Sequence, residues 1–226
     1  MMGALRMRID PAVDQAIRRA VGHGLPVTEE ERESVDSLNL RNAKEITDLG
    51  LFTSLQRLII TGSDPVSVGH FSMIEGLRTL TLEDSGFSDL SGIESLSLLS
   101  LAIPRNWVTD ISPVLNMSTL LQIDVTGNPL SEHSWRHVIP AMRDSGCRVK
   151  ASGELEWRLT VHLHSAGVRI SCYKNSEDYR LCRPGLGLTD LPQYAHPIVS
   201  LEDVRELLAG DPSAAHRYFE GRPRLV

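Results

Sequence analysis

The chain has 226 residues, of which 41% are hydrophobic and 23% charged, a composition ordinary for a soluble globular protein. This length is enough to bury a core in one or two domains. The net charge of −6 argues against nucleic acid as a partner, because contacts to phosphates need a basic face, and no apolar run approaches the ~20 residues of a membrane span.

The cysteine count and the amino terminus indicate a compartment. The chain has three cysteines, an odd number that does not fit the disulfide framework of a small secreted domain. Residues 1–15 contain no apolar segment of the kind found in a secretory signal. Together these features predict a cytoplasmic protein.

Residues 10–21 predict a short helix near the start of the chain. Asp10 is a good N-cap residue, Pro11 suits the first helical position, and Gly22 follows the last apolar residue. A second helix start follows at Thr28, because Glu31 three positions later completes a capping-box pattern.

Residues 35–125 carry the strongest pattern in the chain. An aliphatic residue is followed by another three positions on and a third two positions later, in copies that begin 20, 22, 19 and 24 residues apart. This spacing is typical of a solenoid in which each copy supplies one strand of a parallel sheet. The copies are Val35-Leu38-Leu40, Leu55-Leu58-Ile60, Leu77-Leu80-Leu82, Leu96-Leu99-Leu101 and Leu120-Ile123-Val125.

A second motif recurs between the strand copies, at residues 46–49, 87–90 and 108–111. Each copy has an apolar residue, a hydroxyl residue, an aspartate and an aliphatic residue. We expect the apolar positions to point inward and the polar ones to bond to backbone groups of a turn. Residues 62–74 lack the motif and predict an irregular turn.

These repeats resemble bacterial leucine-rich repeats of the internalin-like class. Residues 10–33 resemble the amino-terminal cap of such proteins, and residues 127–149 resemble their closing unit, a helix followed by a final strand. The resemblance implies an asparagine ladder after the strands. At the corresponding positions stand Ala43, Ser63, Ser85 and Pro104, and only Asn128 matches.

The carboxyl-terminal region resembles no family. The alternation of apolar residues in 153–167 predicts a two-faced strand, and residues 168–182 predict a hairpin with 174–178 as its loop. Residues 183–197 are a connection rich in glycine and proline, and Ser200 is positioned to cap a helix that ends at Gly210.

The fold class is therefore α/β: a short leucine-rich-repeat solenoid with a concave parallel sheet, a helical N-cap and a small carboxyl-terminal α+β appendage. The predicted domains are a capped repeat domain and a small α+β domain. Their bounds are 1–151 (cap 10–33, repeats 34–126, closing unit 127–151) and 152–226.

The residues between the inward aliphatics are expected to form an exposed concave face. Ile59 and Leu98 interrupt its polar pattern, which suggests an apolar anchor with a charged rim, although strands also carry isolated exposed aliphatics without function. The predicted binding residues are Arg41, Arg57, Ile59, Thr79, Thr81, Glu83, Leu98, Ser100, Gln122 and Asp124, with Trp107 close by.

Candidate chemistry is weak. His133 and His137 have a spacing that places both on one helix face, but the flanking residues of a zincin are missing. His162 and His164 would share a face of the predicted strand, and with the cysteines they form the pool for a zinc or thiol site. Cys172 and Cys182 could face each other across the hairpin and form a disulfide under oxidising conditions, but we interpret them as packed small side chains. We predict no enzyme activity, metal or cofactor.

The predicted function is binding of another protein, as an inhibitor or immunity-type partner or as a scaffold or sensor subunit. The acidic balance favours a basic partner, and neither nucleic acid nor a membrane is expected. The alternative is a carboxyl-terminal domain that is a small enzyme or binds metal, with the repeats recruiting its substrate.

Overall fold

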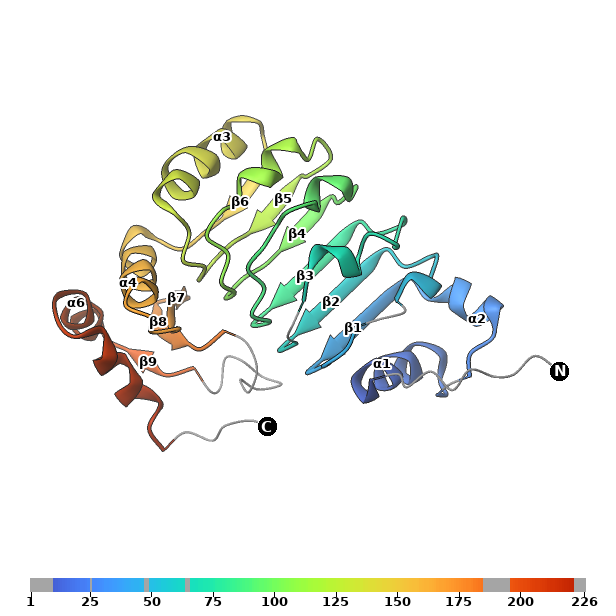
Figure 1. Ribbon diagram of the computed structural model, residues 1–226, viewed down its shortest axis with the longest axis horizontal. Coiled ribbons are helices and arrows are strands. Elements are labelled where there is room, and N and C mark those ends of the chain that lie inside the picture. The colour runs from blue at the N-terminus through green and yellow to red at the C-terminus, as the bar shows by residue number, and fades with distance from the viewer. Residues whose placement is uncertain (1–9, 25, 47–48, 64–65, 185–195, 222–226) are drawn as a thin grey trace.

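A computed structural model describes residues 10–24, 26–46, 49–63, 66–184 and 196–221. The chain forms an arch whose inner side is a six-stranded parallel sheet, with short helices on the outer side (Figure 1). The strands follow one another in chain order, which confirms the predicted solenoid. They are β1 (Ser37–Arg41), β2 (Arg57–Thr61), β3 (Thr79–Glu83), β4 (Ser100–Ala102), β5 (Gln122–Asp124) and β6 (Arg148–Lys150).

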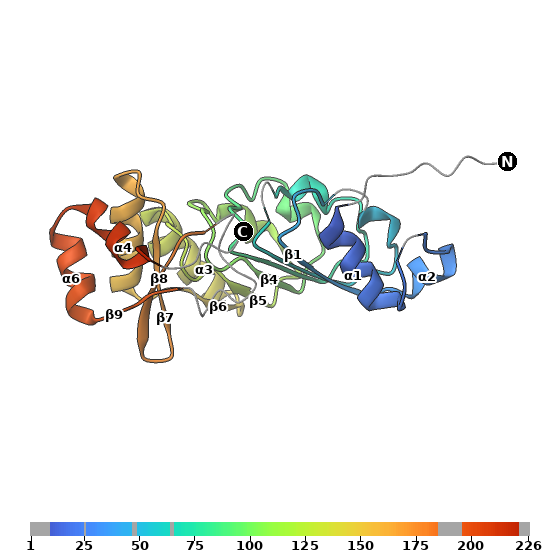
Figure 2. The same cartoon turned by 90° about the horizontal axis from the view of Figure 1, so that it is seen from below.

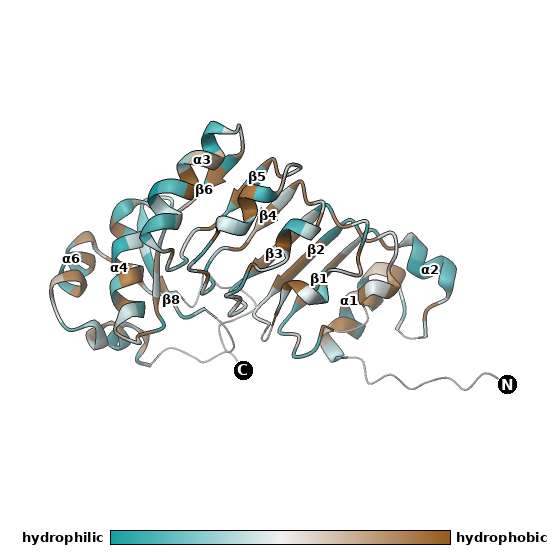
Figure 3. Cartoon of the chain, turned by 45° about the horizontal axis from the view of Figure 1, so that its top comes forward, coloured by the Kyte–Doolittle hydropathy of each residue, from teal (hydrophilic) through white to brown (hydrophobic). Residues whose placement is uncertain are grey.

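The amino-terminal cap follows its local signals. Helix α1 (Pro11–Val21) begins where Ala12 N donates to Asp10 Oδ1 at 2.8 Å, and ends at Gly22, whose φ of 86° suits glycine. The other oxygen of Asp10 accepts from Lys44 N at 2.8 Å and therefore also ties α1 to the first repeat. The predicted capping box at Thr28 starts α2 (Glu29–Ser34), which has no buried side chain; Figure 3 shows it as hydrophilic.

The outer side of the arch consists of short 3₁₀ turns. Asp89 and Asp110 accept from the backbone N of Ser91 and Ser112, both at 2.8 Å, as the recurring motif predicts. Thr47 and Asp48 of the first copy lie outside the described residues. The turns are Leu49–Leu51, Val68–His70, Ile93–Ser95 and Ser112–Asn116, and the closing unit adds a π-helical turn, Ser134–Val138, that continues into α3 (Ile139–Asp144).

The fourth strand copy has a different register from the one predicted. Leu80 pairs with Leu101, Leu98 is 0% exposed, and Leu99 is 43% exposed. The inward skeleton is therefore Leu98, Leu101 and Ile103. The prediction that Leu98 lies on the concave face is wrong, because the pairing with β3 places it in the core beside the equivalent leucines of the other repeats.

The corrected register also restores a buried polar ladder. Position 106, rather than 104, follows the fourth strand, and Asn106 Nδ2 donates to the carbonyls of Leu82 and Pro104 at 2.7 and 3.1 Å. In the earlier repeats a serine stands at the equivalent position, and its hydroxyl oxygen accepts a hydrogen bond from a backbone N–H of the preceding repeat. The bonds along the ladder are Ala43 N to Ser63 Oγ, Ser63 N to Ser85 Oγ, Ser85 N to Asn106 Oδ1 and Val108 N to Asn128 Oδ1.

The segment predicted as a two-faced strand is a helix, α4 (Glu154–Ser165). Its buried positions include Trp157, Thr160 and Leu163, which are three residues apart and so share a helix face. The alternating apolar residues are compatible with this face because some of them, such as Val161, remain partly exposed. Thr160 supplies the buried position between Trp157 and Leu163. Because it is polar, a search for regularly spaced apolar residues does not find this helix face.

The remaining carboxyl-terminal elements form a small antiparallel sheet covered by helices. The predicted hairpin is present as β7 (Ser171–Asn175) and β8 (Asp178–Cys182), with a tighter turn than expected at Ser176 and Glu177. The third strand is β9 (Ile198–Val199). Ser200 caps α6 (Leu201–Ala209) as predicted, and a 3₁₀ segment (Pro212–Phe219) follows. Residues 185–195 of the predicted connection lie outside the described residues.

Trp157 connects the two parts of the molecule. It belongs to the solenoid core, although α4 also contributes Leu159 and Leu163 to a second core around the small sheet. The Trp157 Nε1 donates to the Leu130 carbonyl at 2.7 Å, and the ring stacks on Trp135 with centroids 4.9 Å apart. Helix α4 therefore shares its side chains between both cores.

Candidate protein-binding surface

The concave face is ordered in rows, because each strand pairs in register with the next. Residues opposite one another on parallel strands point the same way, so the outward side chains line up across the sheet. The first row is Ser37, Arg57, Thr79, Ser100, Gln122 and Arg148, and the second is Asn39, Ile59, Thr81, Ala102, Asp124 and Lys150.

The predicted binding residues on β1 to β5 lie on this face, apart from Leu98. Arg41, Arg57 and Gln122 are exposed. Ile59 is only half-buried and stands in the second row. The half-buried polar members are Thr79, Thr81, Glu83, Ser100 and Asp124.

Trp107 belongs to the contact with the carboxyl-terminal unit. The guanidinium of Arg169 lies 4.3 Å from the centre of its indole ring, and the residue is half-buried. The prediction placed Trp107 beside the apolar centre of the concave face. The structure instead gives it a cation–π contact to the segment between α4 and β7.

The predicted set omitted the last strand. Arg148 and Lys150 of β6 extend the two rows, and they could have been found from the final strand expected near residue 149, whose alternation sends both neighbours of Val149 outward. It also omitted Leu99 and Leu121, which are 43% and 60% exposed. The wrong register of the fourth copy had placed Leu99 inside.

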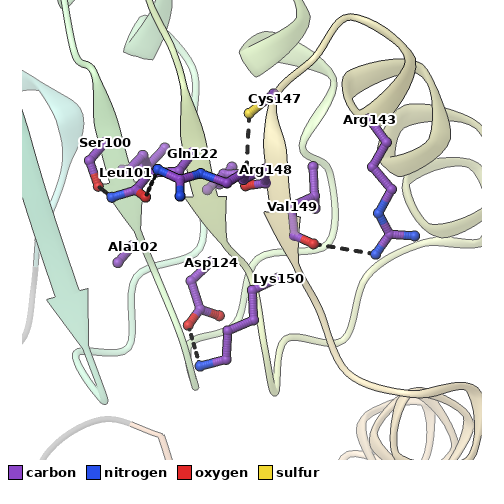
Figure 4. A pocket seen from close by; sticks show the side chains of 11 residues that line it. Ser100, Leu101, Ala102, Gln122, Asp124, Arg143, Cys147, Arg148, Val149 and Lys150 are labelled. Carbon is purple, nitrogen blue, oxygen red and sulfur yellow. Dashed lines mark hydrogen bonds and ion pairs between the residues drawn. The ribbon is translucent and has the colours of Figure 1, made fainter.

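A hollow of about 540 Å³ lies over β4, β5 and β6 (Figure 4). Gln122 links its walls, since its Nε2 donates to Ser100 Oγ at 2.9 Å and its Oε1 accepts from Arg148 at 3.2 Å. Lys150 Nζ lies 2.8 Å from Asp124 Oδ2. These bonds hold the side chains of three neighbouring strands in place.

The charge of the hollow is opposite to that of the whole chain. Its lining contains Arg143, Arg148 and Lys150 but only one carboxylate, Asp124, whereas the chain has a net charge of −6. The Asp124 carboxylate lies against Lys150. The hollow is therefore a local basic site on an acidic protein.

At the carboxyl ends of the strands, a buried ionic cluster joins the solenoid to the small sheet. Arg105 Nε lies 3.1 Å from Asp84 Oδ2, and its guanidinium also pairs with Glu83. The same guanidinium lies 5.0 Å from the centre of the Tyr173 ring on β7. Burial raises the pKa of the Asp84 carboxyl well above its usual value.

His196 completes this junction. Its Nδ1 lies 2.8 Å from the Tyr173 hydroxyl, and the residue is 1% exposed. Burial, with further contributions from the positive charges of Arg105 and Arg180, lowers the His196 pKa to about 3. The imidazole is therefore neutral at physiological pH.

The candidate chemical residues are separated by the fold. His162 and His164 do not share a face as predicted, because residues two apart on a helix point in different directions. Cys172 pairs with Leu181 and Cys182 with Ser171, so the two thiols point to opposite faces of the hairpin. Burial raises the pKa of both thiols, which disfavours the reactive thiolate.

Metal ligands do not converge within the described part of the chain. His133 and His137 lie near each other, with ring centroids 5.4 Å apart, but no group of three or more His, Cys, Asp or Glu side chains among the described residues is arranged to hold a metal ion. The described helices also include none long and apolar enough to cross a bilayer.

No protein-family model matches the chain, and no curated protein matches it. Among solved structures it is similar to an internalin (inlF) from Listeria monocytogenes, with 20% identity, 67% of this chain and 53% of that chain covered, and a TM-score of 0.47. It is also similar to an internalin C2 from the same species, with 20% identity, 65% and 77% covered, and a TM-score of 0.44. The chain thus spans about half the length of the first.

Proposed function

We propose that the protein binds another protein through the concave face of its solenoid. The observation that carries this proposal is the continuous pair of side-chain rows from β1 to β6, exposed or half-buried and ending in a hollow of about 540 Å³. Short solenoids use such faces for binding because the strands supply a rigid platform and the outward residues are free to vary.

The carboxyl-terminal unit packs against the solenoid at the carboxyl ends of its strands, next to the concave sheet. Tyr173 of the hairpin contacts Arg105, which pairs with Glu83 at the carboxyl end of β3. In Figure 2 the β7–β8 hairpin projects away from the body of the molecule. We propose that a bound partner also contacts this hairpin. An inhibitor of a toxin or enzyme and a scaffold or sensor subunit are the two roles consistent with such a surface.

A small enzyme or a metal-binding domain remains the other class of function. Its support would be a converging set of nucleophiles, bases or ligands, and within the described residues the histidines and cysteines are dispersed as above. We therefore favour the binding role.

The test is affinity capture from the host cell followed by mass spectrometry. The wild type is compared with an Arg57→Glu/Ile59→Asp variant of the concave face and with a Glu94→Arg/Ser95→Asp variant of the outer side, where both residues are exposed. We expect a protein that is enriched by the wild type and the outer-side variant and lost with the concave variant. Retention of every captured protein by a folded concave variant would contradict the proposal.

A further inference from the structure

One corner of the concave face differs from the rest at the amino-terminal rim of the sheet. The residues just before successive strands lie side by side, joined by backbone bonds such as Leu121 N to Leu99 O at 2.9 Å. In the second and third repeats this rim position is polar, Gln56 and Arg78. In the fourth and fifth it is leucine, and both leucines are exposed, by 43% for Leu99 and 60% for Leu121.

This leucine pair borders the basic hollow. Leu121 directly precedes Gln122 of the hollow's lining, and its carbonyl accepts from Arg148 N at 2.9 Å. Arg148 donates to the neutral amide oxygen of Gln122, while the carboxylate in the lining, Asp124, lies against Lys150. The guanidinium charge of Arg148 is therefore not balanced by a carboxylate of the hollow.

We infer that this corner, formed by Leu99, Leu121 and the basic hollow, binds an acidic segment of the partner protein that carries an aliphatic or aromatic side chain beside its carboxylates. The inference rests on the proposed function and names the chemistry of the partner. Carboxylates match the paired donors of a guanidinium, and an apolar side chain desolvates exposed leucine surface. The sign of the partner is thus opposite to the one expected from total charge.

Nucleic acid fits the corner less well than protein. A basic hollow attracts phosphates, but the exposed leucines offer them no contact, and the Asp124 carboxylate would lie against a bound backbone. The net charge of −6 adds a repulsive background for a polyanion. A short acidic peptide carries much less charge and gains from the apolar contact.

The experiment is selection of a random peptide library on the full-length protein, followed by fluorescence anisotropy with the selected peptides. The corner variant is Leu121→Ser/Arg148→Glu. The matched control is Gln56→Ser/Arg78→Glu, which makes the same truncation to serine and the same charge reversal at the rim positions of two earlier repeats. Circular dichroism and the thermal midpoint verify that both variants are folded, and a short single-stranded DNA is the competing probe.

We expect the selected peptides to combine Asp or Glu with an aliphatic or aromatic residue. Their affinity for the corner variant should be lower than for the wild type by about tenfold or more. Binding should also weaken as the salt concentration rises.

Selected peptides that are basic, or whose binding is lost only in the control variant, overturn this inference but do not contradict binding through the concave face. DNA binding that depends on Arg148 overturns it in favour of a nucleic acid. Failure to select any peptide that depends on the corner also overturns it, whereas the proposed function is tested separately by affinity capture with the Arg57→Glu/Ile59→Asp variant.

Discussion

The solenoid and the carboxyl-terminal unit solve the same problem, burial of a small sheet, in different ways. In the solenoid each strand repeats the environment of its neighbour, so aliphatic residues and Asn or Ser recur at equivalent buried positions. In the carboxyl-terminal unit each element is unique, and the core around Leu163 and Leu181 is closed by α4 and α6.

This difference teaches where polar groups are placed. The solenoid buries neutral amides and hydroxyls that satisfy backbone groups of adjacent repeats, such as Asn106. The junction with the carboxyl-terminal unit buries charges and a histidine, namely Asp84, Arg105 and His196. Because the ladder side chains are neutral, burying one more of them with each repeat has little electrostatic cost. A buried ion pair has a large desolvation cost, and it favours one arrangement of the solenoid and the carboxyl-terminal unit.

The largest expected effect comes from core truncation in the two regions. Leu80→Ala in the solenoid and Leu163→Ala in α4 each remove a fully buried side chain, and each should lower the free energy of unfolding by about 2–5 kcal/mol. Because Trp157 contributes to the solenoid core from α4, we expect both variants to shift one shared transition in urea, followed by circular dichroism. Two separate transitions, one moved by each variant, would show that the regions unfold independently.

A smaller effect is expected from the polar ladder. Asn106→Ala removes the partner of Ser85 N and Phe87 N and of two carbonyls in the interior, at an expected cost of about 3 kcal/mol. Ser63→Ala removes the one hydroxyl oxygen that accepts from Ala43 N, and it should lower the free energy of unfolding by about 1 kcal/mol. Equal urea midpoints for the two variants would contradict this ranking.

The pH dependence of stability should reside in the junction and in α4. The folded-state pKa of His196 is lowered to about 3 and that of His164 to about 4, both mainly by burial. At these two sites the unfolded chain therefore binds more protons below about pH 6.5. The contribution of the two histidines to stability is complete above that value, and it falls by about 1.4 kcal/mol per pH unit for each histidine as the pH is lowered toward the folded-state pKa.

His196→Gln should reduce this slope, measured as the urea midpoint between pH 6.5 and pH 4.5. His133→Gln, on the exposed surface of the closing helix, serves as the substitution control. An unchanged slope in His196→Gln would show that the buried imidazole does not take up a proton on unfolding in this range.

The smallest expected effects are at the caps of the two ends. Thr28 accepts from Glu31 N at 3.2 Å, and Ser200 accepts from Asp203 N at 3.1 Å. Thr28→Ala and Ser200→Ala should each cost about 1 kcal/mol. Differential scanning calorimetry would resolve them, and a much larger loss for Ser200→Ala would indicate that α6 holds the small sheet more strongly than α2 holds the amino-terminal end.

The strand skeletons of every predicted copy except the fourth, the capped first helix and the capping boxes were predictable because they depend on neighbours in sequence. Most concave residues were predictable too, since alternation along a strand is a local property. Arg148, Lys150 and the leucine pair were missed for separate reasons. The first two required extending the rows to the closing strand, and Leu99 required the correct register.

By itself, the sequence determined the presence of the repeats, the order of the parallel strands and the positions of both caps. It left two skeletons open in the fourth repeat, one through Leu99 and one through Leu98, because both satisfy the same spacing. Pairing of Leu101 with Leu80 decided between them, since hydrogen bonds across the sheet fix the phase of each strand. Tertiary packing also determined that residues 154–165 form a helix, because α4 contributes side chains to two separate cores. The local sequence pattern does not show this shared packing.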